Sequence, residues 1–390
     1  MPDPPAVLHY SPGPAMTERS DETNRRTVPD DHRPFRFSAS GPDRLAQVRL
    51  WHDDRMTSAA STPRPGGHRL VLIGAGWISG YHLAALDRLG RTQLVGVAFG
   101  SLRSAGTAAE PRGAVAYLNA DLERMLDEQR PDIAFVAVPP WVAVSTLEPL
   151  IDRGIPFLTE KPLASTDGSG PVRLAAAIAA NGLVAAAGYH LRGLEAMAEV
   201  RATLEGNPAH LFSARWLCNT PPPAWWRTET TGGGQVIEQA THFYDLARYL
   251  VGEATVVGAV STQEHPFVPA GVDLVDATAA VLRFETGAIG SFANSRRIAS
   301  DTVEVELACD DLLITIRKLP EAQTTWQVTF DDGTSVRTIG PGRDPYEVQA
   351  EAFLDAVDAG DPARVLSSYA DAAKTDQLTR AVVATTGHGG

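Results

Sequence analysis

The sequence predicts an α/β fold in two parts: a doubly wound parallel sheet, then an α+β domain with a large open, mostly antiparallel sheet. In the first part, short apolar runs such as 69–73 end in turn residues and alternate with helical stretches. That alternation is typical of parallel sheets with helices on both faces. After Tyr189, consecutive stretches alternate apolar and polar residues, as in antiparallel strands with one covered face.

The elements of the first part follow one another at short intervals. Buried parallel strands appear as continuous apolar runs, and helices as apolar residues three or four positions apart. The predicted strands are 69–73, 93–98, 133–138, 156–159 and 183–187, and the predicted helices are 81–89, 121–129, 146–153 and 170–181.

The second part combines alternating strands with a few helices. The predicted strands are 211–216, 254–261, 276–284, 288–293, 303–309, 311–317 and 325–330. The predicted helices are 194–204, 234–251, 346–359 and 369–385.

These patterns divide the chain into three regions. Residues 1–66 are rich in Pro, Asp, Arg and Ser without a sustained period, so we expect a disordered N-terminal extension. Residues 67–188 form the expected dinucleotide-binding domain. Residues 189–390 form an expected substrate and oligomerisation domain that ends in closing helices.

Composition excludes several classes of protein. The chain has 390 residues and a net charge of -13, which argues against general nucleic-acid binding because phosphates require a basic surface. Two cysteines, Cys218 and Cys309, are too few for a disulfide framework, and the histidines show no metal-ligand spacing. No apolar run is long enough to span a membrane, so we expect a cytoplasmic protein with neither a metal nor a membrane partner.

A glycine-rich turn follows the first predicted strand. Gly74 and Gly76 begin a G-x-G-x-x-S pattern that runs through Trp77 and Ile78 to Ser79. The first glycine permits the tight turn, and the second lets backbone N–H groups approach a pyrophosphate at the positive end of a helix. In this strand–turn–helix context, the pattern predicts a Rossmann nucleotide site.

The end of the second strand distinguishes NAD from NADP. NAD enzymes usually place an acidic residue there for the ribose hydroxyl. This chain has Phe99 and Gly100, followed by Ser101 and Arg103, which could bind a 2′-phosphate. The sequence therefore favours NADP and leaves NAD open, since Arg103 could instead be the solvated start of a helix.

Two further segments lie where parallel strands end. Pro139 and Trp141 follow the fourth strand, where the nicotinamide half of the cofactor would pass, although Trp141 could simply be packed. Glu160 and Lys161 end the fifth strand at the same edge of the sheet. A lysine ammonium there can polarise a carbonyl, stabilise an alkoxide and relay a proton.

Glu238 and His242 stand four residues apart on a predicted helix, so both face the same way. An imidazole can take the proton of a hydroxyl while a carboxylate orients the substrate or the ring. A solvated helical pair would have the same spacing.

Taken together, these motifs resemble the Gfo/Idh/MocA family, which includes glucose–fructose oxidoreductase and inositol dehydrogenase. The resemblance rests on the turn from Gly74 to His82, the Pro-Pro at 139–140, Glu-Lys-Pro at 160–162, the 232–245 segment and the closing helices. It implies NAD(P)-dependent oxidoreduction of CH–OH groups, with Glu160 and Lys161 at the cofactor and Lys161 as the central catalytic residue. The chain departs from the family pattern at Glu238, usually Asp, and at Ala143, often His.

Several residues in the second part are candidates for contact with a carbohydrate-like substrate. Tyr189 could donate a proton or line the cleft, and Arg192 could bind substrate or form an interdomain ion pair. Trp225 and Trp226 offer aromatic faces suited to a sugar ring, or they could pack a proline-stiffened loop.

The leading hypothesis is hydride transfer between NAD(P) and a sugar, cyclitol or nucleotide-sugar. Lys161 and His242 would handle the proton. The alternatives are a glycosidase or epimerase that oxidises its substrate transiently, and a non-catalytic NAD(P)-sensing regulator. By analogy with open-sheet domains, we also expect a homo-oligomer.

Overall fold

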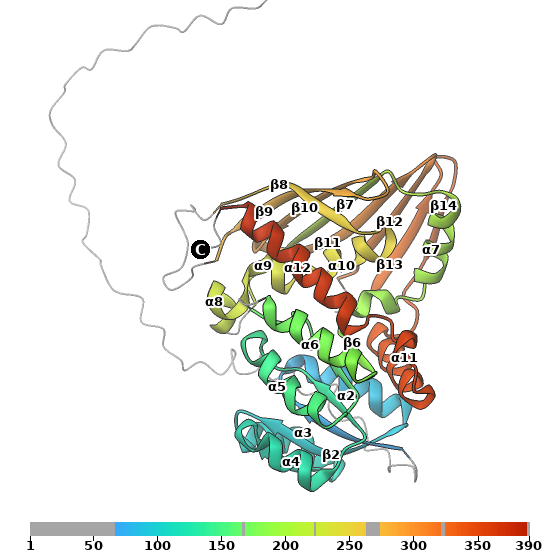
Figure 1. The fold of residues 1–390 in the computed structure, drawn as a ribbon. Helices are drawn as coiled ribbons and strands as arrows, with labels where there is room; N and C mark the ends of the chain where they lie inside the picture. Colours follow the sequence, from blue (N-terminus) through green and yellow to red (C-terminus); the bar gives the residue numbers. More distant parts are fainter. Residues whose placement is uncertain (1–66, 166–167, 222–223, 263–273, 321–323, 388–390) are drawn as a thin grey trace, which may run out of the picture. The chain divides into compact units, whose positions relative to one another are not determined.

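The computed structural model describes residues 67–165, 168–221, 224–262, 274–320 and 324–387 (Figure 1). The segment 1–66, for which we expected disorder, lies outside the described residues. The described part of the chain contains two sheets, one of six strands and one of eight.

The first sheet is parallel throughout, with the strand order β3-β2-β1-β4-β5-β6. Its order reverses between β1 and β4, and in sheets of this kind the ligand binds at the carboxyl ends of the strands beside that point. The strands are β1 (His68–Ile73), β2 (Thr92–Phe99), β3 (Val115–Leu118), β4 (Ile133–Val136), β5 (Phe157–Thr159) and β6 (Ala185–Ala187).

Helices cover both faces of this sheet. One apolar core lies between the sheet and α2, α3 and α11 (Pro345–Ala359), and another between the sheet and α4, α5, α6 and the start of α12 (Tyr369–Thr385). This arrangement confirms the predicted doubly wound α/β fold. The helices in this part are α2 (Trp77–Leu89), α3 (Leu102–Ala109), α4 (Leu122–Gln129), α5 (Pro140–Asp152) and α6 (Ser169–Ala180), with short 3₁₀ helices at η1 (Glu110–Arg112) and η2 (Asn119–Asp121).

Several elements of this part differ from the prediction. Strand β4 ends at Val136, and α5 begins at Pro140 rather than at residue 146. Proline suits the first turn of a helix because its missing N–H would be unpaired there anyway. The strand β3 was missed because its four residues are too few for a clear period.

The second sheet has the order β14-β13-β12-β11-β7-β10-β9-β8. All its neighbouring pairs are antiparallel except β7 and β10, which run parallel, so the predicted mostly antiparallel sheet is confirmed. The strands are β7 (Leu211–Asn219), β8 (Ala254–Thr262), β9 (Ala277–Phe284), β10 (Ile289–Ser295), β11 (Arg297–Cys309), β12 (Leu312–Lys318), β13 (Trp326–Asp331) and β14 (Val336–Ile339).

One face of this sheet packs on helices. Leu282 and Phe292 of the sheet belong to the same core as Tyr244 of α10, whose ring stacks on Phe292 at a centroid distance of 4.3 Å. Side chains that alternate with these are exposed, such as Val281 on β9, 44% exposed. The covering helices are α7 (Met197–Gly206), α9 (Gly234–Glu238), α10 (Thr241–Leu250) and α12 (Tyr369–Thr385), and the shorter elements before them are η3 (His190–Gly193), η4 (Ala224–Arg227) and α8 (Glu229–Gly232).

The last two helices connect the two sheets. Helix α11 (Pro345–Ala359) packs on α2 and completes a core of the first sheet. Helix α12 contacts α6 beside the first sheet and α10 and β8 beside the second (Figure 1). The short η5 (Pro362–Arg364) lies between them in the chain. Helix α11 therefore comes after residue 188 in the chain but packs against the first sheet.

Among the helices that the structure describes, none combines the length and the apolar character needed to cross a membrane.

Candidate active site

The glycine turn lies where the order of the first sheet reverses. Gly74 has φ +102°, and a Cβ at this position would lie 2.1 Å from the carbonyl oxygen of Ala137, directly after β4. Only glycine fits this conformation and this approach of two backbone segments. The Gly74 N–H donates to Ala98 O at 2.8 Å, and Ser79 Oγ donates to Gly74 O at 2.9 Å, so the turn is held from both sides.

The start of α2 is open to a ligand. Gly76 is its N-cap residue, and no described atom lies within 4 Å of a Cβ added there. No side chain caps the helix within the described chain, and its first turn contains no acidic residue. The exposed N–H groups and the positive helix end therefore fit a pyrophosphate. Trp77 is 50% exposed and Ile78 is half-buried beside this opening.

The end of β2 gives Ser101 and Arg103 different roles. Ser101 is the N-cap of α3: its Oγ accepts the Ser104 N–H at 3.2 Å and donates to Ser104 Oγ at 2.9 Å. Arg103 is exposed, and within the described residues its guanidinium has no hydrogen-bond or ion-pair partner. Arg103 is therefore the available group for a 2′-phosphate, whereas Ser101 would have to exchange an existing contact.

Indole rings bridge the two parts of the fold beside α5. Pro139 is the N-cap of α5, and Trp141 in its first turn is 45% exposed. The Trp141 ring meets the edge of Trp225 at 5.7 Å, and Trp225 lies 5.1 Å from Trp226. Trp226 is buried, and its Nε1 has no partner among the described residues. The structure thus brings the predicted cofactor-side and substrate-side tryptophans into one cluster.

Glu160 is fixed by a histidine that we did not single out from the sequence. His82 Nε2 is hydrogen-bonded to Glu160 Oε1 at 2.7 Å, and Glu160 Oε2 accepts the Lys161 N–H at 3.2 Å. Burial works against the charge of Glu160, but His82 and Lys161 outweigh it and lower the pKa of the carboxyl. Both carboxylate oxygens of Glu160 therefore have partners within the described residues. The only sequence signal for His82 was its place in the glycine-turn pattern.

Lys161 joins the two parts of the fold. Its Nζ donates to the backbone oxygen of Glu238 at 2.6 Å and to Glu238 Oε1 at 3.3 Å, and the lysine side chain is 13% exposed. The Lys161–Pro162 peptide bond is cis. The structure therefore brings together two residues 77 positions apart, at the carboxyl edge of the parallel sheet.

The predicted helix 234–251 is wrong in one respect, because the structure breaks it into α9 and α10 after Glu238. In an unbroken helix the His242 N–H would bond to Glu238 O; here it points to Gln239 O at 3.4 Å. The free carbonyl of Glu238 can then accept Lys161 Nζ. The break thus creates the contact, and the regular i, i+4 face that we expected for Glu238 and His242 does not exist.

His242 lies among rings. The indole of Trp216 is stacked on it at 5.9 Å, the Tyr189 ring meets it at 5.8 Å, and the His190 ring at 4.7 Å. Its Nδ1 is buried without a partner in the described chain. Burial, with the nearby His190 and Lys161, lowers the pKa of His242 well below its usual value, so the imidazole is neutral at physiological pH and able to accept a proton.

Glu238 has the opposite shift. Burial raises its pKa to about 8, against the opposing effect of Lys161. Its Oε2 is buried without a partner among the described residues. At neutral pH the carboxyl is mostly protonated, so it can donate a hydrogen bond.

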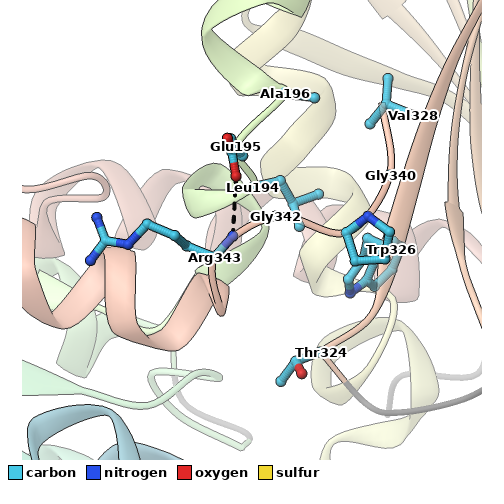
Figure 2. A pocket seen from close by; sticks show the side chains of 10 residues that line it. Leu194, Glu195, Ala196, Thr324, Trp326, Val328, Gly340, Gly342 and Arg343 are labelled. Atoms are coloured by element: carbon cyan, nitrogen blue, oxygen red, sulfur yellow. Dashed lines mark hydrogen bonds between the residues drawn. The ribbon is translucent and has the colours of Figure 1, made fainter. Parts of the chain in front are cut away.

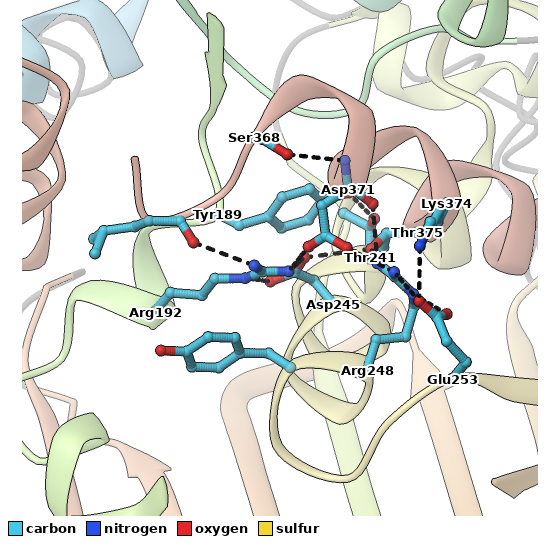
Figure 3. A network of polar contacts seen from close by, with 12 residues as sticks. Tyr189, Arg192, Thr241, Asp245, Arg248, Glu253, Ser368, Asp371, Lys374 and Thr375 are labelled. Atoms are coloured by element: carbon cyan, nitrogen blue, oxygen red, sulfur yellow. Dashed lines mark hydrogen bonds and ion pairs between the residues drawn. The ribbon is translucent and has the colours of Figure 1, made fainter. Parts of the chain in front are cut away.

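Two predicted substrate residues are already engaged (Figure 3). Arg192 is buried, and its guanidinium binds Asp245 through Nε at 2.8 Å and Asp371 through Nη2 at 2.6 Å. The donors of Arg192 face carboxylates, which favours the ion pair over contact with a substrate. Tyr189 is 1% exposed, and its hydroxyl is hydrogen-bonded to Thr241 Oγ1 at 2.8 Å. Burial raises the pKa of this hydroxyl well above 10. These properties fit a residue that lines the site rather than one that donates a proton.

The structure contains a separate pocket, drawn in Figure 2, that includes none of the predicted site residues. It lies between the start of α7, β13 and the segment before α11. Its lining consists of Leu194, Glu195, Ala196, Thr324, Trp326, Val328, Gly340, Pro341, Gly342 and Arg343. In the part of the chain that the structure describes, no group of three or more His, Cys, Asp or Glu side chains could hold a metal ion.

The raised pKa of Glu238 has an expected effect on stability. A carboxyl that titrates near 8 when folded and near 4.5 when unfolded holds more proton in the folded state between these values. Its contribution to the free energy of unfolding is therefore present below 4.5 and is lost as the pH rises towards 8. We expect Glu238→Gln to flatten the decline in melting temperature between pH 6 and 8.5, measured by thermal denaturation without cofactor. Parallel curves for the two proteins would contradict the buried, protonated carboxyl.

Family models match both parts of the chain. Residues 68–189 match the family model described as the oxidoreductase family with an NAD-binding Rossmann fold. Residues 205–315 match the GFO/IDH/MocA C-terminal domain. The protein is thus an oxidoreductase that uses NAD or NADP. It belongs to the GFO/IDH/MocA family, as the sequence motifs indicated.

Among curated relatives, the rhizopine catabolism protein MocA of Rhizobium meliloti is 27% identical over 79% of this chain and 92% of its own length. Levoglucosan dehydrogenase of Pseudarthrobacter phenanthrenivorans is 25% identical over 58% of this chain and 66% of its own.

Two solved structures have a similar fold. A levoglucosan dehydrogenase in complex with NADH and levoglucosan has a TM-score of 0.72 and 21% identity, covering 83% of this chain and 98% of its own. A 3-ketoreductase from Actinomadura kijaniata in complex with NADP has a TM-score of 0.70 and 20% identity, covering 82% and 98%.

Proposed function

We propose that this protein transfers a hydride between NAD(P) and a CH–OH group of a sugar or cyclitol, with Lys161 and His242 handling the proton. The observation that carries the proposal is the contact of Lys161 with Glu238, near the neutral His242, at the edge of the sheet that bears the glycine turn. The levoglucosan and inositol dehydrogenases among the relatives support the substrate class.

The residues that would hold the cofactor are those of the open turn. The backbone N–H groups after Gly76 would bind the pyrophosphate, Arg103 a 2′-phosphate where one is present, and Pro139 and Trp141 would flank the nicotinamide half. When bound, the nicotinamide supplies the hydride acceptor or donor. Glu160 and His82 hold Lys161 at this edge.

In the oxidation direction, one C–H and one O–H bond break. A bound nicotinamide would accept the hydride, and the proton of the hydroxyl goes to a ring nitrogen of His242, which is neutral and able to accept it. The Lys161 ammonium stabilises the negative charge that develops on the oxygen. Protonated Glu238 donates a hydrogen bond that orients the substrate.

The test is a screen of NAD and NADP against levoglucosan, myo-inositol, D-glucose and nucleotide-sugars, monitored by formation of the reduced cofactor. Net formation with any of them supports the proposal. Conversion of the sugar without net reduced cofactor would indicate transient oxidation, as in a glycosidase or epimerase. Cofactor binding without turnover of any compound would indicate a regulator.

The choice between cofactors gives a separate prediction. We expect Arg103→Ala to lower kcat/KM for NADP about tenfold, because a charge-assisted contact to phosphate is lost, and to leave NAD nearly unchanged. Steady-state kinetics with both cofactors measures this. Arg173→Ala, which removes another exposed arginine, is the control and should change neither value. An equal loss with both cofactors would overturn the role of Arg103 at the 2′-phosphate.

A further inference from the structure

We propose that His190 contacts the substrate directly and binds a hydroxyl on the carbon next to the one that is oxidised, so that the enzyme requires a vicinal diol. This inference rests on the proposed function and assigns a role to a residue that the mechanism above does not use. We call His190 and His242 together the imidazole pair.

The position of His190 in the fold supports direct contact with the substrate. His190 begins η3, directly after the short connection from β6, at the same carboxyl edge as Lys161. Its ring meets His242 at a centroid distance of 4.7 Å and an interplanar angle of 71°. On its other side it stacks on Tyr346 of α11 at 4.5 Å and 17°. His190 is therefore held by packing on two sides beside the proposed base.

The ring nitrogens of His190 are available to form hydrogen bonds with a ligand. His190 is only 4% exposed, and neither of its ring nitrogens forms a hydrogen bond with another described residue. Buried polar groups in folded proteins are nearly always paired, and an unpaired one lowers stability. His242 Nδ1 is also unpaired among the described residues and is fully buried, whereas the nitrogens of His190 are not among the fully buried unpaired atoms. Two neighbouring imidazoles with unpaired nitrogens are complementary to a ligand that carries neighbouring hydroxyls.

The charge of the His190 ring also suits a hydroxyl group. Burial lowers the pKa of His190 to about 4, in spite of the opposing effect of Glu160, and the nearby Lys161 and His82 act in the same direction as burial. The ring is therefore neutral and offers one N–H donor and one acceptor. A hydroxyl group, itself donor and acceptor, matches this pattern, whereas a phosphate or carboxylate would meet only one donor.

The spacing of the imidazole pair narrows the class of substrate. Ring centres 4.7 Å apart suit two hydroxyls on adjacent carbons of a sugar or cyclitol ring. His242 would take the proton of one hydroxyl while His190 holds its neighbour.

The test compares each polyol with its analogue that lacks a hydroxyl next to the oxidised carbon. The probes are levoglucosan, myo-inositol and D-glucose and their monodeoxy analogues, with kcat and KM measured separately. In the wild type, we expect loss of the adjacent hydroxyl to lower kcat/KM about tenfold or more, because a buried site then keeps unpaired groups.

Two variants separate hydrogen bonding from packing. His190→Phe keeps a flat ring but has no nitrogen, and it should lower kcat/KM for the polyol about tenfold while the deoxy analogue is no longer discriminated. His190→Asn keeps a donor and an acceptor and should restore part of the discrimination. His210→Phe replaces an exposed histidine before β7 and should behave as wild type.

The outcomes are distinct. Equal discrimination by wild type and His190→Phe would overturn the role of His190 while leaving the proposed oxidoreduction intact. Failure of every polyol to reduce either cofactor in the wild type would overturn the proposed function and this inference with it. A collapse of discrimination in His190→Phe but not in His210→Phe supports the inference, and unchanged circular dichroism of the variants excludes unfolding as its cause.

Discussion

Replacing Lys161 by methionine is expected to lower kcat for sugar or cyclitol oxidation about a thousandfold, since a preorganised charge at the reacting oxygen is worth about that much. Methionine keeps most of the length of the side chain but loses the ammonium, which lies 2.6 Å from the carbonyl oxygen of Glu238 in a nearly closed environment. Cofactor affinity should change little, because the pyrophosphate site lies at the start of α2.

The measurement combines steady-state formation of reduced cofactor with cofactor binding by fluorescence. The matched control is Lys318→Met on β12, whose lysine has the same 13% exposure and binds Asp301 at 2.7 Å. That variant should retain activity. If Lys161→Met kept more than a tenth of the wild-type kcat, the ammonium would not act at the reacting oxygen.

The second large effect concerns stability. We expect Asp245→Ala to lower the free energy of unfolding by about 3–5 kcal/mol, because it removes one partner of a buried ion pair and leaves the other charge behind. Asp245 is 1% exposed and binds Arg192 through both carboxylate oxygens, at 2.8 and 2.5 Å. Asp371 of α12 also contacts Arg192, but it is partly exposed and compensates incompletely (Figure 3).

Urea titration followed by circular dichroism measures this change. The control is Glu148→Ala, which breaks the exposed pair of Glu148 and Arg173 and should alter the free energy of unfolding by less than about 1 kcal/mol. A loss below about 1 kcal/mol in Asp245→Ala would show that water replaces the carboxylate at Arg192. Since Asp245 and His242 share α10, the variant should also lower kcat at temperatures where it is folded.

The network around Arg192 explains why the site can span two sheets. Arg248 of α10 binds Asp371 at 2.7 Å, so α12 is joined both to η3 through Arg192 and to α10 (Figure 3). At its other end, Arg380 of α12 donates to the carbonyl oxygens of Ala164 at 2.9 Å and Ser165 at 3.2 Å, just after Lys161. Helix α12 therefore holds the segments that carry Lys161 and His242.

Much of the fold could be predicted from local pattern. The last helix begins and ends where predicted, at 369 and 385. The other predicted helices and strands are present with shifted ends, and the helix predicted at 234–251 is divided in two. Apolar periodicity and glycine placement are local properties, so they are visible in single segments. The order of the second sheet was not predictable: β7 lies between the consecutive strands β10 and β11, parallel to one and antiparallel to the other.

The site was predictable to a similar extent. Lys161, Glu238 and His242 were singled out from the sequence, and the structure brings Glu238 to Lys161. His82 and His190 were not singled out as site residues, because a lone histidine after a turn or a strand has no distinctive spacing. Their significance appears only through partners far away in the chain, Glu160 for His82 and Tyr346 for His190.

By itself, then, the sequence determined the parallel sheet, the turn at Gly74 and Gly76, and the placement of Lys161 at the carboxyl edge. Each follows from residues next to one another in the chain. Tertiary structure alone decided that Glu238 offers its carbonyl to Lys161 and that His190 lies beside His242. The physical reason is that these contacts depend on a helix break and on packing between distant segments, which local propensity does not encode.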